Sequence, residues 1–114
     1  MRIRTSLVAL VLGFAALAGA ALGAAANPNH GKTLFKANCK TCHIKDGGAK
    51  DLTPLSKTQA QWTRAFKAPS MDTMVKRVQA RAGTALTPAD VADIQAFLVA
   101  HAVDSDQPET CGAK

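Results

Sequence analysis

Aromatic residues are scarce in this chain of 114 residues, which has no tyrosine, one tryptophan and four phenylalanines. Phe14 lies in an apolar N-terminal run, so only Phe35, Trp62, Phe66 and Phe97 remain for a folded core. A core with so few large side chains is small, and a small domain often needs an additional stabilising group. The chain also lacks a basic helix and a cluster of aromatic residues, so we do not expect it to bind nucleic acid.

Patterns typical of catalysis are missing as well. The sequence contains no Ser/His/Asp order, no paired carboxylates in an apolar context and no glycine-rich phosphate loop. We therefore do not expect an enzyme that uses protein groups for its chemistry. The sequence also shows no β-strand pattern, internal repeat or second domain, which predicts an all-α fold in one domain.

The N-terminal segment has the features of a secretory signal peptide. Met1-Arg2-Ile3-Arg4 is followed by an uncharged run from Leu7 to Ala26 that ends in three alanines, a pattern typical of cleavage before Asn27. The alternative is a membrane anchor, because the run is nearly long enough to span a bilayer. We expect residues 1–26 to be cleaved, and the mature protein to be exported, periplasmic and not membrane-spanning.

The strongest chemical signal is Cys39-Lys40-Thr41-Cys42-His43, the C-x-x-C-H pattern of covalent haem attachment. Cys39 and Cys42 can each bond to one vinyl group of a porphyrin, and His43 then supplies an axial ligand to the iron. A bare C-x-x-C also occurs in redox dithiols and zinc sites, but those expect a βαβ setting or another nearby Cys or His pair. The sequence has neither, so it predicts one covalently attached haem c.

Cys111 has no partner within the chain once the other two cysteines hold a haem. We expect residues 104–114 to form a C-terminal tail, because they are rich in Asp, Ser, Pro and Gly. An incidental exposed thiol in a frayed tail is one interpretation of Cys111. The other is an intermolecular disulfide with another protein or a second copy.

The mature chain has a basic balance, with 12 Lys and Arg against 8 Asp and Glu once Arg2 and Arg4 are removed. A positive rim near the haem edge would attract redox partners with acidic docking surfaces. The alternative is an ordinary solvated surface. The lysines expected on this rim are Lys32, Lys36, Lys40 and Lys45.

Capping and breaker residues predict four helices in the mature chain. Their expected ranges are Gly31 to Cys42, Ser56 or Thr58 to about Lys67, Ser70 to Gly83, and Thr87 to about Ala102. The third helix has an apolar face that includes Met71, Met74 and Val78, and its basic residues Lys76, Arg77 and Arg81 are expected elsewhere on its surface.

This arrangement resembles the small monohaem c-type cytochromes of class I over residues 27–103. The resemblance implies a cytochrome c fold, in which about four short helices wrap one covalently bound haem and the N- and C-terminal helices cross. Gly31 and Phe35 match the small and aromatic residues of the family's first helix. Ile94 and Phe97 match the aliphatic and aromatic residues of its last helix.

The resemblance also implies further contacts with the haem. Pro54 matches a proline whose carbonyl accepts the second N–H of the ligand histidine. Trp62 matches a tryptophan that hydrogen-bonds a haem propionate, although it could also pack on the ring edge as a core residue. For the sixth position on the iron we predict Met74, with Met71 as the alternative, while methionines on such a face also commonly fill a core.

Two further histidines are weaker ligand candidates. His101 would give bis-histidine ligation, but we expect it to be a core or surface residue at the end of the last helix. His30 is expected to be solvent-exposed. With methionine ligation, the resemblance implies a periplasmic one-electron carrier. The alternatives are a haem subunit of a larger redox complex and an open-site haem protein of peroxidase-like or gas-binding type.

Overall fold

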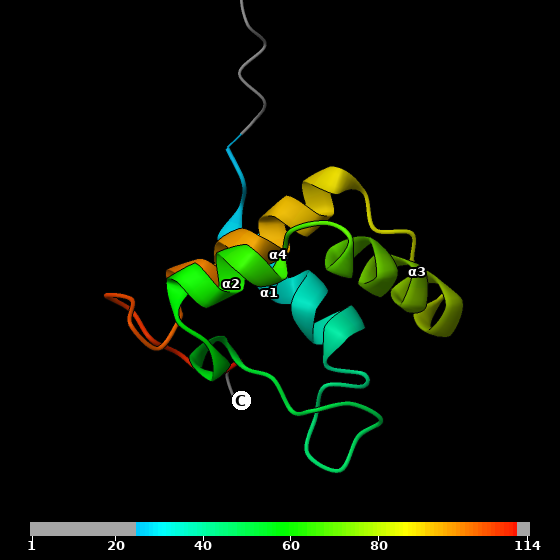
Figure 1. Cartoon of the computed structure of the whole chain (residues 1–114), viewed down its shortest axis with the longest axis horizontal. Coiled ribbons are helices and arrows are strands. Elements are labelled where there is room, and N and C mark those ends of the chain that lie inside the picture. Colours follow the sequence, from blue (N-terminus) through cyan, green and yellow to red (C-terminus); the bar gives the residue numbers. More distant parts are fainter. Residues whose placement is uncertain (1–24, 112–114) are drawn as a thin grey trace, which may run out of the picture.

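The computed structural model describes residues 25–111, so the predicted signal peptide lies almost entirely outside the described residues. Between residues 25 and 111 the chain contains helices and turns and no strand, which confirms the all-α prediction (Figure 1). The elements are α1 (Pro28–Leu34), the π-helical turn η1 (Phe35–Cys39), the 3₁₀ turn η2 (Pro54–Ser56), α2 (Gln59–Ala65), α3 (Ser70–Ala82) and α4 (Pro88–Ala100).

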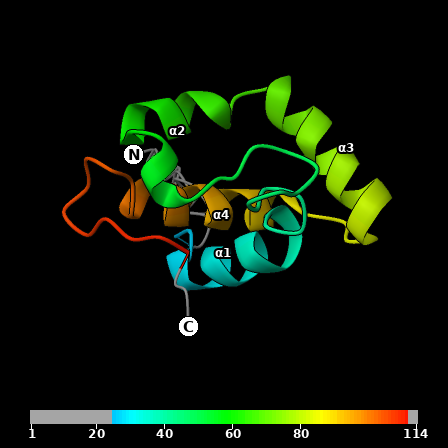
Figure 2. The same ribbon diagram turned by 90° about the horizontal axis from the view of Figure 1, so that it is seen from below.

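Helix α4 is the central element, and it contacts both α1 and α2 (Figure 2). Gly31 is buried where α1 crosses α4, and a Cβ atom there would overlap the backbone carbonyl of Asp93. Close approach of the two helices therefore requires a residue without a side chain at this position. Beside the crossing, the rings of Phe35 and Phe97 pack with their centroids 6.0 Å apart, and both side chains are almost fully buried.

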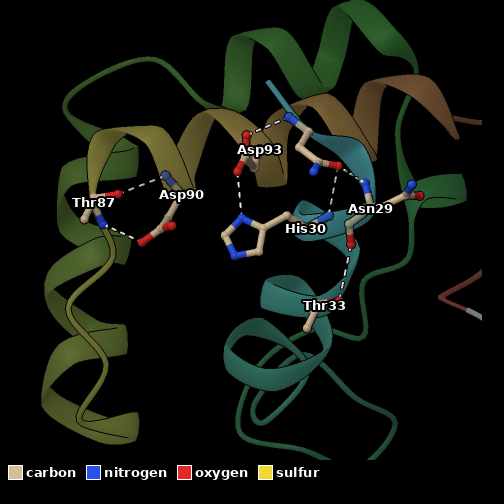
Figure 3. Close-up of polar contacts among 7 residues, drawn as sticks. Asn29, His30, Thr33, Thr87, Asp90 and Asp93 are labelled. Atoms are coloured by element: carbon tan, nitrogen blue, oxygen red, sulfur yellow. Dashed lines mark hydrogen bonds and ion pairs between the residues drawn. The ribbon is translucent and has the colours of Figure 1, made fainter. Parts of the chain in front are cut away.

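The N-terminus of α1 is fixed to α4 by polar contacts (Figure 3). The Asn27 side chain caps the helix by accepting from the backbone N–H groups of Asn29 and His30, so α1 begins at Pro28 rather than at the predicted Gly31. One carboxylate oxygen of Asp93 accepts from the backbone N–H of Asn27 at 2.7 Å, and the other lies 2.7 Å from His30 Nδ1. Both hydrogen bonds lower the pKa of the Asp93 carboxyl, and the bond with His30 has the larger effect.

Local capping sets the starts of the later helices. Thr58 and Thr87 each accept from the backbone N–H of the third residue of their helix, and Gln61 and Asp90 return the bond to the cap residue. Helix α3 ends at Ala82 and is capped by Gly83, which has a φ of 69°, a left-handed conformation that glycine adopts without steric cost. The four predicted helices are therefore present with shifted ends.

The C-terminal segment, described as far as residue 111, packs against the domain and is not the frayed tail that one interpretation of Cys111 supposed. It folds back along the domain (Figure 2): Asp104 accepts from the Gln59 backbone N–H at 2.8 Å, and Glu109 lies 2.7 Å from Lys32 Nζ. Cys111 is only 8% exposed and belongs to the same buried cluster as Phe35 and Phe97. The exposed-thiol interpretation of Cys111 is therefore wrong, because these long-range contacts bury the residue.

Candidate functional site

The two motif cysteines and the motif histidine are brought together by a tight turn after η1. The backbone N–H groups of Cys42 and His43 both donate to the Cys39 carbonyl, at 3.2 and 2.9 Å. The Thr41 hydroxyl donates to the Asn38 carbonyl at 2.7 Å, which ties the turn to the helix before it. The turn therefore gathers two sulfur atoms and one imidazole at a helix end, as the motif predicts.

Cys39 and Cys42 are half-buried and do not form a disulfide. Burial, with the neighbouring Cys111 as a smaller cause, raises the pKa of the Cys39 thiol to about 11. A redox dithiol needs a thiolate with a lowered pKa to act as its nucleophile. The environment of Cys39 therefore weighs against the dithiol interpretation of the motif.

His43 is oriented by the loop that follows it. Its Nδ1 atom lies 2.8 Å from the Lys50 carbonyl oxygen, and a carbonyl only accepts, so Nδ1 carries the proton and donates it. The lone pair then resides on Nε2, the tautomer that a metal-binding histidine needs. The loop is held in turn by the Leu52 N–H, which donates to the His43 carbonyl at 3.2 Å, and by Lys40, whose Nζ lies 2.6 Å from Asp51.

The structure gives Pro54 and Trp62 other partners than the family resemblance implied, and it places Trp62 in the core, which was the alternative prediction. The Pro54 carbonyl accepts from Trp62 Nε1 at 2.8 Å, in a buried position, rather than from His43. The single N–H of the indole is thereby engaged, so in this arrangement it is not free to donate to a propionate. Pro54 in η2 lies beside Trp62 of α2, whose side chain is only 3% exposed, whereas the loop places Lys50 beside His43.

A large apolar cavity opens beside the motif, with about 770 Å³ of space when the part open to solvent is included. The walls come from η1, the loop after the motif, and helices α2, α3 and α4. They include Phe35, Leu52, Trp62, Val78, Ile94 and Leu98. Such walls fit a flat apolar ring, with thiols and an imidazole at one edge.

Methionine and histidine reach the same space from different elements. A second cavity adjoins the first, and Cys39, His43 and Met74 line both of them, while Cys42 lines the second. Met71 lines the first cavity and a third, more open one beside it, but not the second cavity. Met74 therefore shares a cavity with all three motif residues, Cys39, Cys42 and His43, whereas Met71 shares one with Cys39 and His43 only.

The two remaining histidines do not line either cavity. His30 faces Asp93 at the start of α1 (Figure 3). His101 Nδ1 lies 2.7 Å from the Gln107 carbonyl, and its ring packs against Phe97 with the centroids 5.4 Å apart. His101 caps the end of α4, and its bond to the C-terminal segment holds its ring away from the site.

Sequence reasoning missed two arginines beside the motif. Arg77 and Arg81 were expected away from the apolar face of the third helix, but both line the second cavity with Met74 and Cys42. Their spacing from Met74, three and seven residues along α3, is the signal that could have found them. Lys50 had no such signal, because its contribution to the site is a backbone carbonyl.

The comparisons with known proteins agree with this site. The family model described as cytochrome c oxidase, cbb3-type, subunit III matches residues 26–98, well over half of the chain. The chain belongs to this family of c-type cytochromes. Its fold is the cytochrome c fold, its cofactor is covalently bound haem c, and its activity belongs to electron transport. No curated protein and no solved structure matched the chain in the other comparisons.

The described residues of this cytochrome contain neither a membrane-spanning helix nor a side-chain cluster of the kind that binds a free metal ion. No helix within residues 25–111 is long and apolar enough to cross a membrane. Within the same residues no group of three or more His, Cys, Asp or Glu side chains is placed to hold a metal ion. A haem iron needs no such group, because the porphyrin supplies four of its ligands and the protein adds only axial ones.

Proposed function

We propose that this cytochrome is an exported one-electron carrier whose haem is attached to Cys39 and Cys42, with His43 and Met74 as the axial ligands. The observation that carries the proposal is that Cys39, His43 and Met74 line both adjoining cavities. The backbone carbonyl of Lys50 supports this assignment because it accepts a hydrogen bond from His43 Nδ1, which leaves Nε2 available for iron.

The residues around the site suit electron transfer better than substrate turnover. The haem supplies a reversible one-electron couple at its iron, and the protein supplies ligands, an apolar wrap and a docking surface. With haem bound, the thioether of Met74 would be the second protein ligand of the iron and would raise the potential. The walls around it carry no carboxylate, so the site has no acidic side chain for proton transfer to a substrate.

The spectra of Met74→Ala and Met71→Ala, measured side by side on the oxidised haem protein, test the ligand assignment. We expect Met74→Ala to keep its haem but to lose the weak red absorption typical of methionine bound to ferric iron, and to have a lower potential. Met71→Ala is the matched control on the same helix and should keep both properties. The reverse pattern would transfer the ligand role to Met71.

Cysteine variants test the attachment itself. Cys39→Ala and Cys42→Ala should each impair maturation, because holding the haem and folding are linked in so small a core. The covalent bond is measured by haem staining after denaturing electrophoresis. Cys111→Ala is the control, and staining of equal strength in all three variants would contradict the proposed attachment.

We further propose that residues 1–26 are a cleaved signal peptide, and that residues 27–103 form the cytochrome domain, followed by residues 104–114. The match to the family begins at residue 26, next to the proposed cleavage point. Sequencing the N-terminus of the protein from a periplasmic extract should give Asn27 as the first residue. A protein that starts at Met1 and sediments with membranes would mean that the segment is an anchor.

The partners that we propose are redox proteins with acidic docking surfaces. Of the four rim lysines, Lys32 pairs with Glu109 and Lys40 with Asp51, while Lys36 and Lys45 are exposed and have no ion-pair partner within residues 25–111. Two of the four positive charges predicted for the rim are therefore neutralised by carboxylates of the protein itself.

Arg77 and Arg81 extend the positive charge to the second cavity, where Cys42 lies. Replacing both by glutamine should slow oxidation by anionic hexacyanoferrate, speed reaction with cationic hexaammineruthenium, and weaken the dependence on salt. Arg64→Gln/Lys67→Gln removes the same charge elsewhere and serves as the control. Equal effects of the two double variants would exclude a localised docking face.

A haem subunit of a larger redox complex is the second candidate, and the family description, which names an oxidase subunit, favours it. In that case the haem-stained protein should elute with a high-mass complex when gently solubilised native extracts are chromatographed. Burial of Cys111 weighs against a disulfide as the link. An open-site haem protein would instead show a high-spin spectrum that shifts readily with carbon monoxide.

A further inference from the structure

The walls of the apolar cavity carry one side chain with a permanent charge, and it belongs to Lys57. The other titratable groups that line this cavity are the Cys39 thiol and the His43 imidazole. A cation in such surroundings costs free energy unless a counter-charge is near. None of the ion pairs within residues 25–111 includes Lys57, so the protein itself supplies no carboxylate for it.

Lys57 is also held in place on the cavity wall. Its carbonyl accepts from the Val103 N–H at 3.3 Å, and the next residue, Thr58, caps α2. Its ammonium lies 5.7 Å from the centroid of the Trp62 ring, a cation–π distance that keeps the side chain along the cavity wall. The lysine is therefore positioned by the fold rather than extended freely into solvent.

Haem carries two propionate carboxylates on the edge of its ring, and a carboxylate that enters an apolar cavity needs hydrogen bonds or a cation. The indole of Trp62 cannot take this role in the observed arrangement, because it donates to Pro54. We infer that the ammonium of Lys57 pairs with a haem propionate. It would then be the propionate partner that the family resemblance implied for Trp62. This inference rests on the proposed function, since it needs the haem to occupy the cavity.

The pairing has a measurable consequence for the iron. The ferric site carries one more positive charge than the ferrous site, so a nearby cation disfavours oxidation and raises the reduction potential. Lys57→Met should therefore have a lower midpoint potential at neutral pH than the wild-type holoprotein. Lys57→Arg keeps the charge and should restore most of the potential.

A matched control separates a specific pair from a loss of surface charge. Lys67 is exposed after α2 and lines neither cavity, so Lys67→Met removes the same charge from a neighbouring position. The second measurement is the resonance Raman band of propionate bending, which responds to the partner of the carboxylate. The expected result is a lower potential and a shifted band in Lys57→Met, with both nearly unchanged in Lys67→Met.

Two outcomes would overturn the inference. One is a Lys57→Met holoprotein whose potential and propionate band match the wild type, and the other is an equal drop in potential in the two variants with no change in the band. If Lys57→Met does not hold haem, Lys57→Gln replaces it in the same comparison. Failure of the proposed function is recognised separately, because the wild-type protein would then lack an attached haem or the spectrum of methionine ligation.

Discussion

Replacing Gly31 by alanine tests whether the crossing of α1 and α4 is as tight as the structure shows. Two effects oppose each other. Alanine favours a helix over glycine by about 1 kcal/mol. Against this, the added Cβ would overlap the Asp93 carbonyl and approach the Ile94 amide, and overpacking of this kind costs about 1–3 kcal/mol.

The overpacking effect should win, because the neighbours of the new Cβ are backbone atoms and not the flexible end of a side chain. Relief requires α4 to move away from α1, and that movement separates the ring pair of Phe35 and Phe97 beside the crossing. We therefore expect the upper end of the overpacking range and a net loss of about 2 kcal/mol in the free energy of unfolding.

Denaturant unfolding of the holoprotein measures this loss. With a slope of about 3 kcal/mol/M in guanidinium chloride, 2 kcal/mol lowers the unfolding midpoint by about 0.7 M. Thr33→Ala is the control, since it lies on the exposed side of α1 and gains helix propensity without an overlap. An unfolding midpoint for Gly31→Ala at or above that of the wild type would refute the reasoning about the crossing.

Three further predictions concern buried and paired groups. Trp62→Phe leaves the buried Pro54 carbonyl without its donor, so we expect a loss of about 1–3 kcal/mol in denaturant unfolding, and an unchanged midpoint would contradict the importance of this bond. The pKa of Asp93 is lowered from 3.8 by folding, so its ionised form stabilises the native state above that pH, and the stability is lost as the pH falls through the folded value. Asp93→Asn should therefore be less stable than the wild type at pH 7, and the difference in unfolding free energy should shrink towards pH 3; a constant difference would show that the charge is unimportant. Cys111 is buried and burial raises its pKa, so iodoacetamide should modify it slowly in the native protein and rapidly in denaturant, and equal rates would show that the C-terminal segment opens freely.

Much of the fold could be predicted from the sequence because its signals are local. Thr58 and Thr87 mark helix starts through caps that involve only the next three residues. The family resemblance of Gly31 and Phe97 predicted that the first and last helices cross, and both residues lie at or beside that crossing. The covalent haem follows from the five residues of the motif, and the family match agrees with it.

The errors arose where the outcome depends on contacts between distant segments. Cys111 appeared to lie in a frayed tail, and it is buried because Asp104 and Glu109 bond to α2 and α1. Pro54 was assigned to His43 and bonds to Trp62 instead. Composition and spacing carry no information about which of several free carbonyls a donor will meet.

The sequence by itself therefore determined the kind of protein: an all-α chain with a haem motif at a helix end, set by local helix signals and by residue chemistry. The tertiary structure decided what surrounds the haem site. It turned the Lys50 carbonyl towards His43, brought Met74 and the two arginines of α3 to the motif, and left Lys57 as the charged residue of an apolar cavity. These relations depend on how α3, α4 and the loops pack, and packing is a property of the whole chain rather than of any one stretch.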